Sequence, residues 1–185
     1  MEDEKIIELY ISRSEKAISE TDSKYGSYCR TIANNILADS GETEECVNDT
    51  YFSAWNAIPP TIPKMLKTFI GKITRNKALN MFEKRTASKR YNGQVGLSLD
   101  ELSECFASSE NVEGSIERKE TIKALNEFLE GLDKNKRIYF MQRYWYLTPI
   151  KEIAEKNNIS EGSLKTMLCR IRADLKKYIA EKGLY

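Results

Sequence analysis

Residues 147–175 have the sequence LTPIKEIAEKNNISEGSLKTMLCRIRADL, and this stretch decides the fold class of the chain. Apolar residues recur in it at steps of three and four, which predicts two helices that each bury one face. Thr148 is the expected N-cap of the first helix, and Pro149 is its expected first residue, where a missing amide hydrogen costs nothing. The small side chain of Ala154 lets the two helix axes approach closely. The stretch therefore predicts a helix-turn-helix.

The turn of this motif falls at Asn157 and Asn158, because asparagine adopts the left-handed conformation more readily than most other residues. Ser160 is the expected N-cap of the second helix. In a helix-turn-helix the start of the second helix enters the DNA major groove, where early side chains contact bases and later basic ones contact phosphates. A plain helical hairpin is the alternative, but it does not require the small residue, the turn asparagines and the cap at this spacing.

Charge is distributed along the chain in blocks that the net charge of +1 conceals. Residues 64–90 contain 9 basic and 1 acidic side chains, and residues 160–185 contain 6 basic and 3 acidic ones. The other two stretches, 1–63 and 91–159, are acidic overall. Two basic blocks are typical of a protein that contacts a polyanion at two places, although solvated helix faces give the same pattern.

The rest of the chain predicts further helices and one connector. Helical periodicity occurs at residues 25–36, 42–58 and 64–90, and again from residue 116 onward. Pro59, Pro60 and Pro63 require a loop between the second and third of these helices. Residues 92–115 are rich in glycine, serine and acidic residues and predict a flexible acidic linker. The expected fold class is therefore all-α, with two small helical domains, residues 1–91 and 116–185, on either side of this linker.

The composition argues against several classes of protein. No apolar run approaches the ~20 residues of a membrane span, and the acidic N-terminus is unlike a secretory signal, so we expect a cytoplasmic protein without membrane insertion. Four scattered cysteines and the absence of histidine argue against a metal site, and Cys29 and Cys46 fit buried helical faces instead. With neither histidine nor a glycine-rich phosphate loop, the chain is not expected to be an enzyme or to hold a cofactor.

Three stretches taken together resemble a bacterial RNA polymerase sigma factor of the extracytoplasmic-function (ECF) type. Residues 44–55 (EECVNDTYFSAW) are similar to the core-binding helix of that family, and residues 69–80 (FIGKITRNKALN) are similar to its −10 helix. Residues 153–172 are similar to its −35 recognition unit. The chain departs from the family pattern at five positions: Asn48 and Asp49 replace Gln-Glu, Asn80 replaces Asp, Asn158 replaces Gly, and Met167 replaces Arg.

The resemblance implies a role for each of these stretches. The core-binding contacts would be Glu45, Asn48, Asp49 and Phe52, and the −10 DNA contacts would be Lys72, Arg75, Asn76 and Lys77. The −35 DNA contacts would be Ser160, Glu161, Ser163, Lys165, Thr166, Arg170 and Arg172. The loop at residues 56–67 would capture an unpaired base. The anionic linker residues Asp100, Glu101 and Glu104 would be attracted to basic channel walls of the polymerase.

The implied partners are the RNA polymerase core, through its large catalytic subunits, promoter DNA in duplex and single-stranded form, and an anti-sigma protein. Such a protein would bind core polymerase, recognise the −35 duplex and help to melt the −10 element. One alternative is a dimeric helix-turn-helix repressor or activator with an N-terminal sensor domain, which does not account for the basic residues 64–90. Another is an enzyme acting on nucleic acid, but no clustered carboxylates accompany the basic helix.

Overall fold

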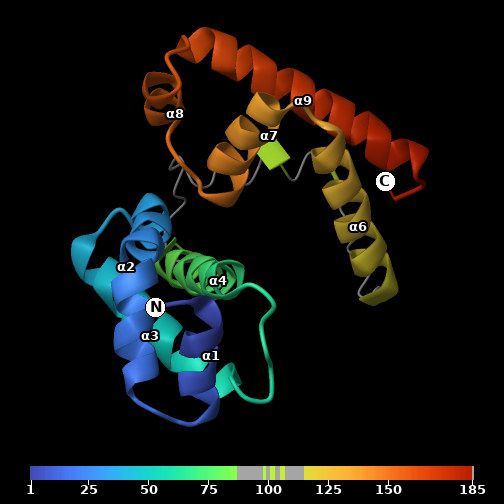
Figure 1. Cartoon of the computed structure of the whole chain (residues 1–185). Coiled ribbons are helices and arrows are strands. Elements are labelled where there is room, and N and C mark those ends of the chain that lie inside the picture. Colours follow the sequence, from blue (N-terminus) through green and yellow to red (C-terminus); the bar gives the residue numbers. More distant parts are fainter. Residues whose placement is uncertain (87–97, 99–100, 103–104, 107–114, 185) are drawn as a thin grey trace. The chain divides into compact units, whose positions relative to one another are not determined.

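The computed structural model describes residues 1–86, 98, 101–102, 105–106 and 115–184. The chain divides into two compact units, Met1–Tyr91 and Asn92–Tyr185. Every regular element among the described residues is a helix, so the prediction of an all-α fold is confirmed for them (Figure 1). None of the described helices is long and apolar enough to cross a membrane.

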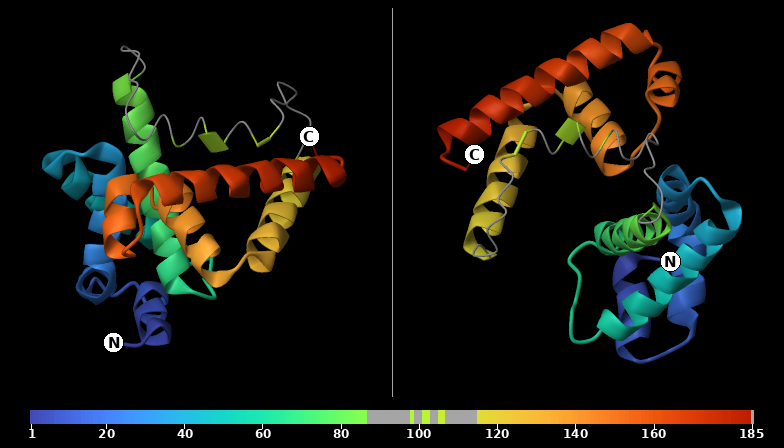
Figure 2. Two further views of the ribbon diagram at one scale, coloured as in Figure 1. Left: turned by 90° about the horizontal axis from the view of Figure 1, so that it is seen from above. Right: turned by 180° about the vertical axis from the view of Figure 1, so that it is seen from behind.

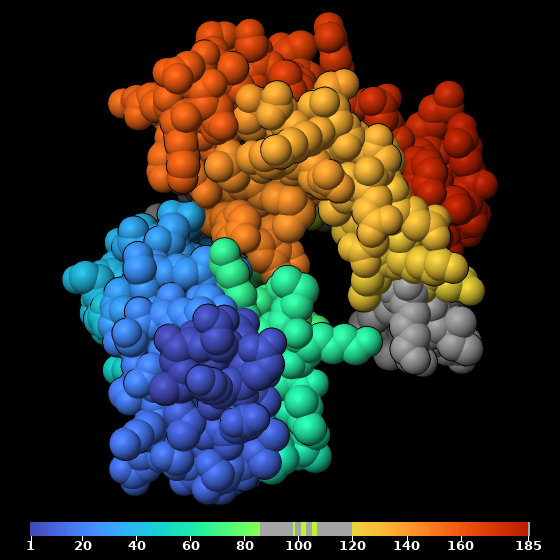
Figure 3. Space-filling view, in the orientation of Figure 1, coloured from blue at the N-terminus to red at the C-terminus, as the bar shows by residue number. Residues whose placement is uncertain are grey.

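The first unit contains the helices α1 (Asp3–Ile11), α2 (Lys16–Leu37), α3 (Ser40–Ala57) and α4 (Leu66–Thr86). Helices α2, α3 and α4 pack against one another, and α1 packs against α2 on the outer side of the unit (Figure 3). The periodicity at residues 25–36 predicted only the second half of α2. The sequence interpretation missed α1 and the first turns of α2.

The connection between α2 and α3 is only two residues long. Ala38 ends α2 in the left-handed conformation with φ 52°, and its amide donates to the carbonyl of Asn34. The carboxylate of Asp39 then accepts a hydrogen bond from the amide of Glu42 at 2.8 Å and caps α3. The left-handed residue Ala38 and the Asp39 cap turn the chain sharply and place α3 antiparallel against α2.

Helical periodicity predicts that α4 buries Leu66, Phe69, Ile70, Ile73 and Met81. Leu66 and Ile70 are fully buried as predicted, whereas Phe69, Ile73 and Met81 are only partly buried, and the prediction missed the fully buried Ala78. With buried Thr74, the fully buried side chains follow steps of four residues, and α4 contacts both α2 and α3. The helix was predicted to continue to residue 90, and its last four predicted residues lie outside the described part.

The second unit contains α6 (Ser115–Gly131), α7 (Lys134–Phe140), a π-helical turn η1 (Met141–Trp145), α8 (Ile150–Lys156) and α9 (Glu161–Glu181). Helices α6, α7 and α8 each contact the long α9 (Figure 2). Their buried side chains form one core, made of Cys105, Ala124, Tyr139, Phe140, Tyr144, Ile153, Ala154, Leu164, Leu168, Ile171, Leu175 and Ile179.

The helix-turn-helix forms much as predicted. Asn158 is left-handed with φ 53°, and Ser160 accepts a hydrogen bond from the amide of Ser163 at 3.1 Å as the N-cap of α9. One prediction was wrong. Pro149 was expected to be the first residue of α8 after a Thr148 cap. Its backbone is extended instead, with ψ 139°, so Pro149 is itself the N-cap and α8 begins at Ile150. Thr148 instead donates its amide to the carbonyl of Gln142 at 2.9 Å.

Part of the predicted linker belongs to the second unit. Leu102 and Phe106 pack against the core of that unit, and Cys105 is itself a core residue with only 2% exposure. The prediction of a flexible linker across residues 92–115 is therefore wrong for these positions, because their apolar side chains find a buried face on the helix-turn-helix unit. Asp100 and Glu104 lie outside the described residues.

Candidate nucleic-acid interface

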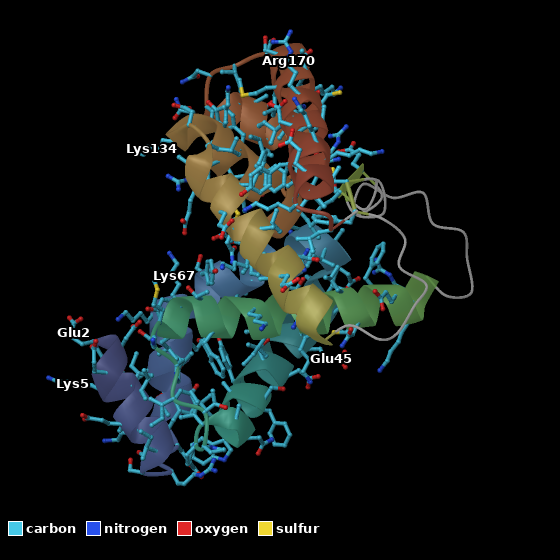
Figure 4. All side chains as sticks on the ribbon, turned by 90° about the vertical axis from the view of Figure 1, so that its right-hand side faces the viewer. Glu2, Lys5, Glu45, Lys67, Lys134 and Arg170 are labelled. Atoms are coloured by element: carbon cyan, nitrogen blue, oxygen red, sulfur yellow. The ribbon has the colours of Figure 1, made fainter. Side chains whose placement is uncertain are left out.

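The outward face of α9 carries six of the seven predicted −35 contacts. The cap residue and the five outward side chains are all exposed: Ser160, Glu161, Ser163, Lys165, Thr166 and Arg170. Figure 4 shows Arg170 on the outer surface of α9. Lys165 Nζ lies 3.6 Å from Glu161 Oε2, but this is an exposed pair one turn apart and contributes little to stability. Lys165 is therefore free to exchange this carboxylate for a phosphate.

A groove of about 520 Å³ runs beside this face of α9. Ser163, Thr166 and Arg170 line it from α9, and Lys136 lines it from α7. Two cationic side chains and two hydroxyl groups thus line the same hollow, together with the carboxylate of Asp174. These are the groups that bind a phosphate backbone.

Arg172, the seventh predicted contact, is not exposed as the other six are. Its side chain is only 21% exposed, and its Nη1 donates to Glu101 Oε2 at 3.1 Å and to Tyr144 Oη at 2.5 Å. The expectation that Arg172 points outward with Lys165 is therefore wrong. Periodicity placed it on an outer flank of α9, but the connector packs over that flank and supplies a carboxylate.

The predicted −10 residues on α4 divide into two groups. Lys72 and Asn76 are exposed. Arg75 is partly buried, and burial lowers the pKa of its guanidinium below the ordinary value. Lys77 is also partly buried, and its Nζ lies 3.5 Å from Asp49 Oδ2 on α3. Lys77 was predicted to contact −10 DNA and Asp49 was predicted to contact core polymerase. In the structure these two residues pair with each other.

The loop between α3 and α4 presents apolar side chains to solvent. Ile62 and Met65 are each 65% exposed. Lys67 lies next to this loop, and its Nζ is 5.2 Å from the centre of the Tyr28 ring. An exposed apolar pair beside a cation suits an unstacked base, which needs both an apolar surface and a partner for its phosphate.

The predicted core-binding residues share one outer face of α3. Glu45, Asn48, Asp49 and Phe52 are all exposed and follow helical spacing, and Figure 4 labels Glu45 on this face. Phe52 is 65% exposed, which is unusual for so large an apolar side chain. A groove of about 720 Å³ lies beside it between α2 and α3, and Asn48, Tyr51, Phe52 and Trp55 are among its lining residues.

A hydrogen-bond network holds α3 against α2 beneath this face. Tyr51 Oη donates to Asp22 Oδ1 at 2.8 Å, and Arg30 donates to Asp22 Oδ1 at 3.0 Å and to Glu44 Oε1 at 2.8 Å. Burial, together with the hydrogen bond to Asp22, raises the pKa of the Tyr51 phenol, so the tyrosine remains a donor. Sequence reasoning identified none of these links, because the partners lie far apart along the chain.

Sequence reasoning also missed Arg143. This arginine lies in η1, and its side chain is only 4% exposed. The one signal in the sequence was a basic residue within an otherwise apolar and aromatic run, YFMQRYWYL at residues 139–147. Among the described residues, no three side chains of the metal-ligating kinds come together.

The geometry thus combines a helix-turn-helix in one unit with a basic helix in the other, and this combination is typical of DNA-binding proteins. The sigma-70 region 2 model matches residues 23–88, and the sigma-70 region 4 model matches residues 122–175. The two matches lie in the expected order and together cover well over half of the chain. The chain belongs to the sigma-70 family, whose members direct promoter recognition in transcription initiation together with RNA polymerase core.

Comparison with solved structures finds a likeness to "Structure of CnrH in complex with the cytosolic domain of CnrY". The TM-score is 0.45 with 16% sequence identity, and the match covers 97% of this chain and 97% of the other. A likeness at this level adds nothing to the family assignment. Comparison with curated proteins finds no significant sequence match.

Proposed function

We propose that this chain is a sigma factor of the compact ECF type, with region 2 in residues 1–91, region 4 in residues 116–185 and a connector between them. It binds core polymerase through α3, engages the −10 element with α4 and the loop before it, and contacts the −35 duplex with α9. It acts in the cytoplasm, catalyses nothing itself and needs no cofactor. The observation that carries the proposal is that two sigma-70 regions, each with an exposed basic helix, occur in one chain.

The α3 face fits a protein partner better than DNA. Its centre is the exposed ring of Phe52, and its rim is polar, with Glu45 and Asn48. Protein interfaces are organised in this way, with an aromatic anchor inside a polar rim. The acidic Glu45 would also repel a phosphate backbone and attract a basic protein surface. We therefore assign this face to the polymerase core.

The surface formed by α4 and its preceding loop fits opened DNA. Lys72 and Asn76 project from the helix, and Ile62 and Met65 project from the loop. Extruding a base costs a few kcal/mol, which an apolar surface and backbone contacts can offset. Lys77 is a weaker candidate for this role than Lys72, because Asp49 already neutralises it in part.

The proposed inhibitor is an anti-sigma protein, as the family resemblance implies. The exposed α3 face and the outward face of α9 are the two surfaces that such a protein would have to cover to block polymerase and promoter binding. An inhibitor that covers the α3 face would compete with core polymerase for Phe52.

Reconstitution with core RNA polymerase tests the proposal. The full chain should bind core and direct initiation from a limited set of promoters selected from a random-sequence library. Phe52→Ala should weaken core binding at least about thirtyfold, as expected for loss of an interface anchor of about 2 kcal/mol. Ile11→Ala is the matched control, since Ile11 is an exposed apolar residue of α1 with 43% exposure. Failure of the full chain to bind core would overturn the proposal.

The same preparation tests the repressor alternative. A sigma factor of this kind is expected to be a monomer when free, whereas a repressor that binds a palindrome is expected to be a dimer. Light scattering of the purified chain separates the two. A stable dimer that binds a palindromic duplex without core polymerase would favour the repressor.

A further inference from the structure

The second unit contains a buried cation. The Arg143 side chain is 4% exposed, and neither its Nε nor its Nη1 has a hydrogen-bond partner among the described residues. Its Nη2 lies 3.6 Å from Glu101 Oε1. Burying a charge is strongly unfavourable unless an opposite charge compensates it, and the Glu101 carboxylate provides that charge for Arg143.

The carboxylate is held from three sides. Its Oε2 accepts a hydrogen bond from Arg172 Nη1 at 3.1 Å and another from Tyr144 Oη at 3.1 Å, while Oε1 faces Arg143. Burial raises the pKa of the Tyr144 phenol to about 12, so this hydroxyl keeps its proton and donates it to Glu101. Two cations and one neutral donor thus form a site that is complementary to a single carboxylate.

The residues that follow Glu101 attach the connector to the same unit. Leu102 and Phe106 pack on the core, and the thiol of buried Cys105 lies 3.6 Å from the backbone carbonyl of Arg172. The polar contact and the apolar contacts reinforce each other. Releasing the carboxylate would therefore loosen these apolar contacts as well.

Arg172 projects from α9 on nearly the same side as Lys165. It lies seven residues after Lys165, which is two helical turns, so both side chains leave the helix on nearly the same side. Lys165 is 59% exposed, whereas Arg172 is 21% exposed because Glu101 and Tyr144 hold it. Without Glu101, Arg172 would extend the row of cations that begins at Lys165.

We propose that Arg143, Tyr144 and Arg172 form a carboxylate-binding site that Glu101 occupies, and that this contact docks the connector and withholds Arg172 from DNA. Glu101 is thus a positioning residue that acts through Arg172. The statement about DNA rests on the proposed function, whereas the docking itself does not.

The salt dependence of DNA binding tests the effect on Arg172. The protein is the full chain, and the probe is a random-sequence DNA duplex. Glu101→Gln should steepen the slope of log Kobs against log salt by about 0.9, the value for one added phosphate contact. Adding Arg172→Gln to that variant should restore the original slope. Glu127→Gln is the matched control, because the Glu127 carboxylate likewise contacts a tyrosine and a cation, Tyr178 and Lys182, but in an exposed network.

Thermal unfolding tests the docking without reference to DNA. Glu101→Gln should lower the melting temperature by about 5 °C or more, because buried Arg143 loses its carboxylate, whereas Glu127→Gln should change it little. If Glu101→Gln does not fold, Glu101→Asp replaces it. The shorter side chain keeps a negative charge in this site but draws it back from Arg172, so the salt slope should still steepen.

Three results would overturn the proposal. The first is an unchanged melting temperature in Glu101→Gln, and the second is an unchanged salt slope in a folded Glu101 variant. The third is a shallower salt slope when Arg172→Gln is introduced into the otherwise wild-type chain. The last result would mean that Arg172 already contacts phosphate. A full chain that binds no duplex at all would instead count against the proposed function, while the melting experiment would still report on the docking.

Discussion

Tyr10 Oη lies 2.9 Å from Thr21 Oγ1, and both residues are fully buried between α1 and α2. Thr21 Oγ1 also lies 2.7 Å from the carbonyl oxygen of Ala17, to which it donates its only proton. Tyr10 must therefore donate to Thr21. Burial raises the pKa of the Tyr10 phenol, in keeping with a hydroxyl that stays protonated. This link fixes α1, the helix that sequence periodicity did not reveal.

Because Tyr10 donates this hydrogen bond, Tyr10→Phe and Thr21→Val should lower the free energy of unfolding by different amounts. Tyr10→Phe leaves Thr21 bonded to Ala17 and should cost about 1 kcal/mol of unfolding free energy. Thr21→Val leaves the buried hydroxyl of Tyr10 without an acceptor and should cost more, about 1–3 kcal/mol. Guanidinium unfolding of both variants measures the difference. Equal costs would mean that the donor is assigned wrongly.

The four cysteines should differ sharply in reactivity. Cys29, Cys46 and Cys105 are buried, whereas Cys169 is exposed on α9. Burial raises the pKa of the Cys46 thiol to about 12 and also raises that of Cys29, so neither is an accessible thiolate near neutral pH. An aromatic disulfide reagent should modify one thiol quickly in the native protein and four in denaturant. Cys169→Ser should abolish the fast reaction, and more than one fast thiol would contradict the structure.

Stability should fall at alkaline pH. Burial raises the pKa of Tyr25, Tyr144 and Cys46 to about 12, above their ordinary values of 10.0 for the phenols and 9.0 for the thiol. A raised pKa favours the protonated form in the folded state. The stability from these groups is therefore complete below about pH 9 and is lost as pH rises toward 12, by up to about 1.4 kcal/mol per pH unit for each group.

Denaturant unfolding at several values between about pH 8 and pH 11 measures this loss. Cys46→Ala removes one of the titrating groups, so its stability should decline less steeply over the same range than that of the wild type. A wild-type stability that stays constant through this range would contradict the prediction.

The exposed cations of α9 should differ in their effect on DNA binding according to position. Lys165→Ala and Arg170→Ala should each weaken duplex binding and reduce the salt slope by about 0.9, because each removes one phosphate contact. Lys177→Ala is the matched control on the same helix, where Lys177 is 79% exposed and lies 3.8 Å from Glu181. Fluorescence anisotropy over a range of salt concentrations gives all three slopes. An equal effect of Lys177→Ala would mean that general charge, rather than the helix-turn-helix, binds the DNA.

The helix-turn-helix shows how much the sequence determines. Asn158 in the turn and Ser160 at the cap were both predicted, and the structure confirms both. These features depend on residues three or four positions apart, so the local sequence contains all the interacting groups. The exposed face of α3 around Phe52 was predictable for the same reason, because helical periodicity alone separates it from the buried face.

Arg172 shows what only the tertiary structure decided. In the sequence it is a cation on the same side of α9 as Lys165, and nothing local distinguishes the two. In the fold its partner is Glu101, 71 residues earlier, in a segment that composition alone marks as a flexible linker. Periodicity fixes the side of a helix from which a side chain projects, because that depends on 3.6 residues per turn. The partner that the side chain meets on that side of the helix depends on contacts between segments distant in the sequence, and these contacts form only when the chain packs.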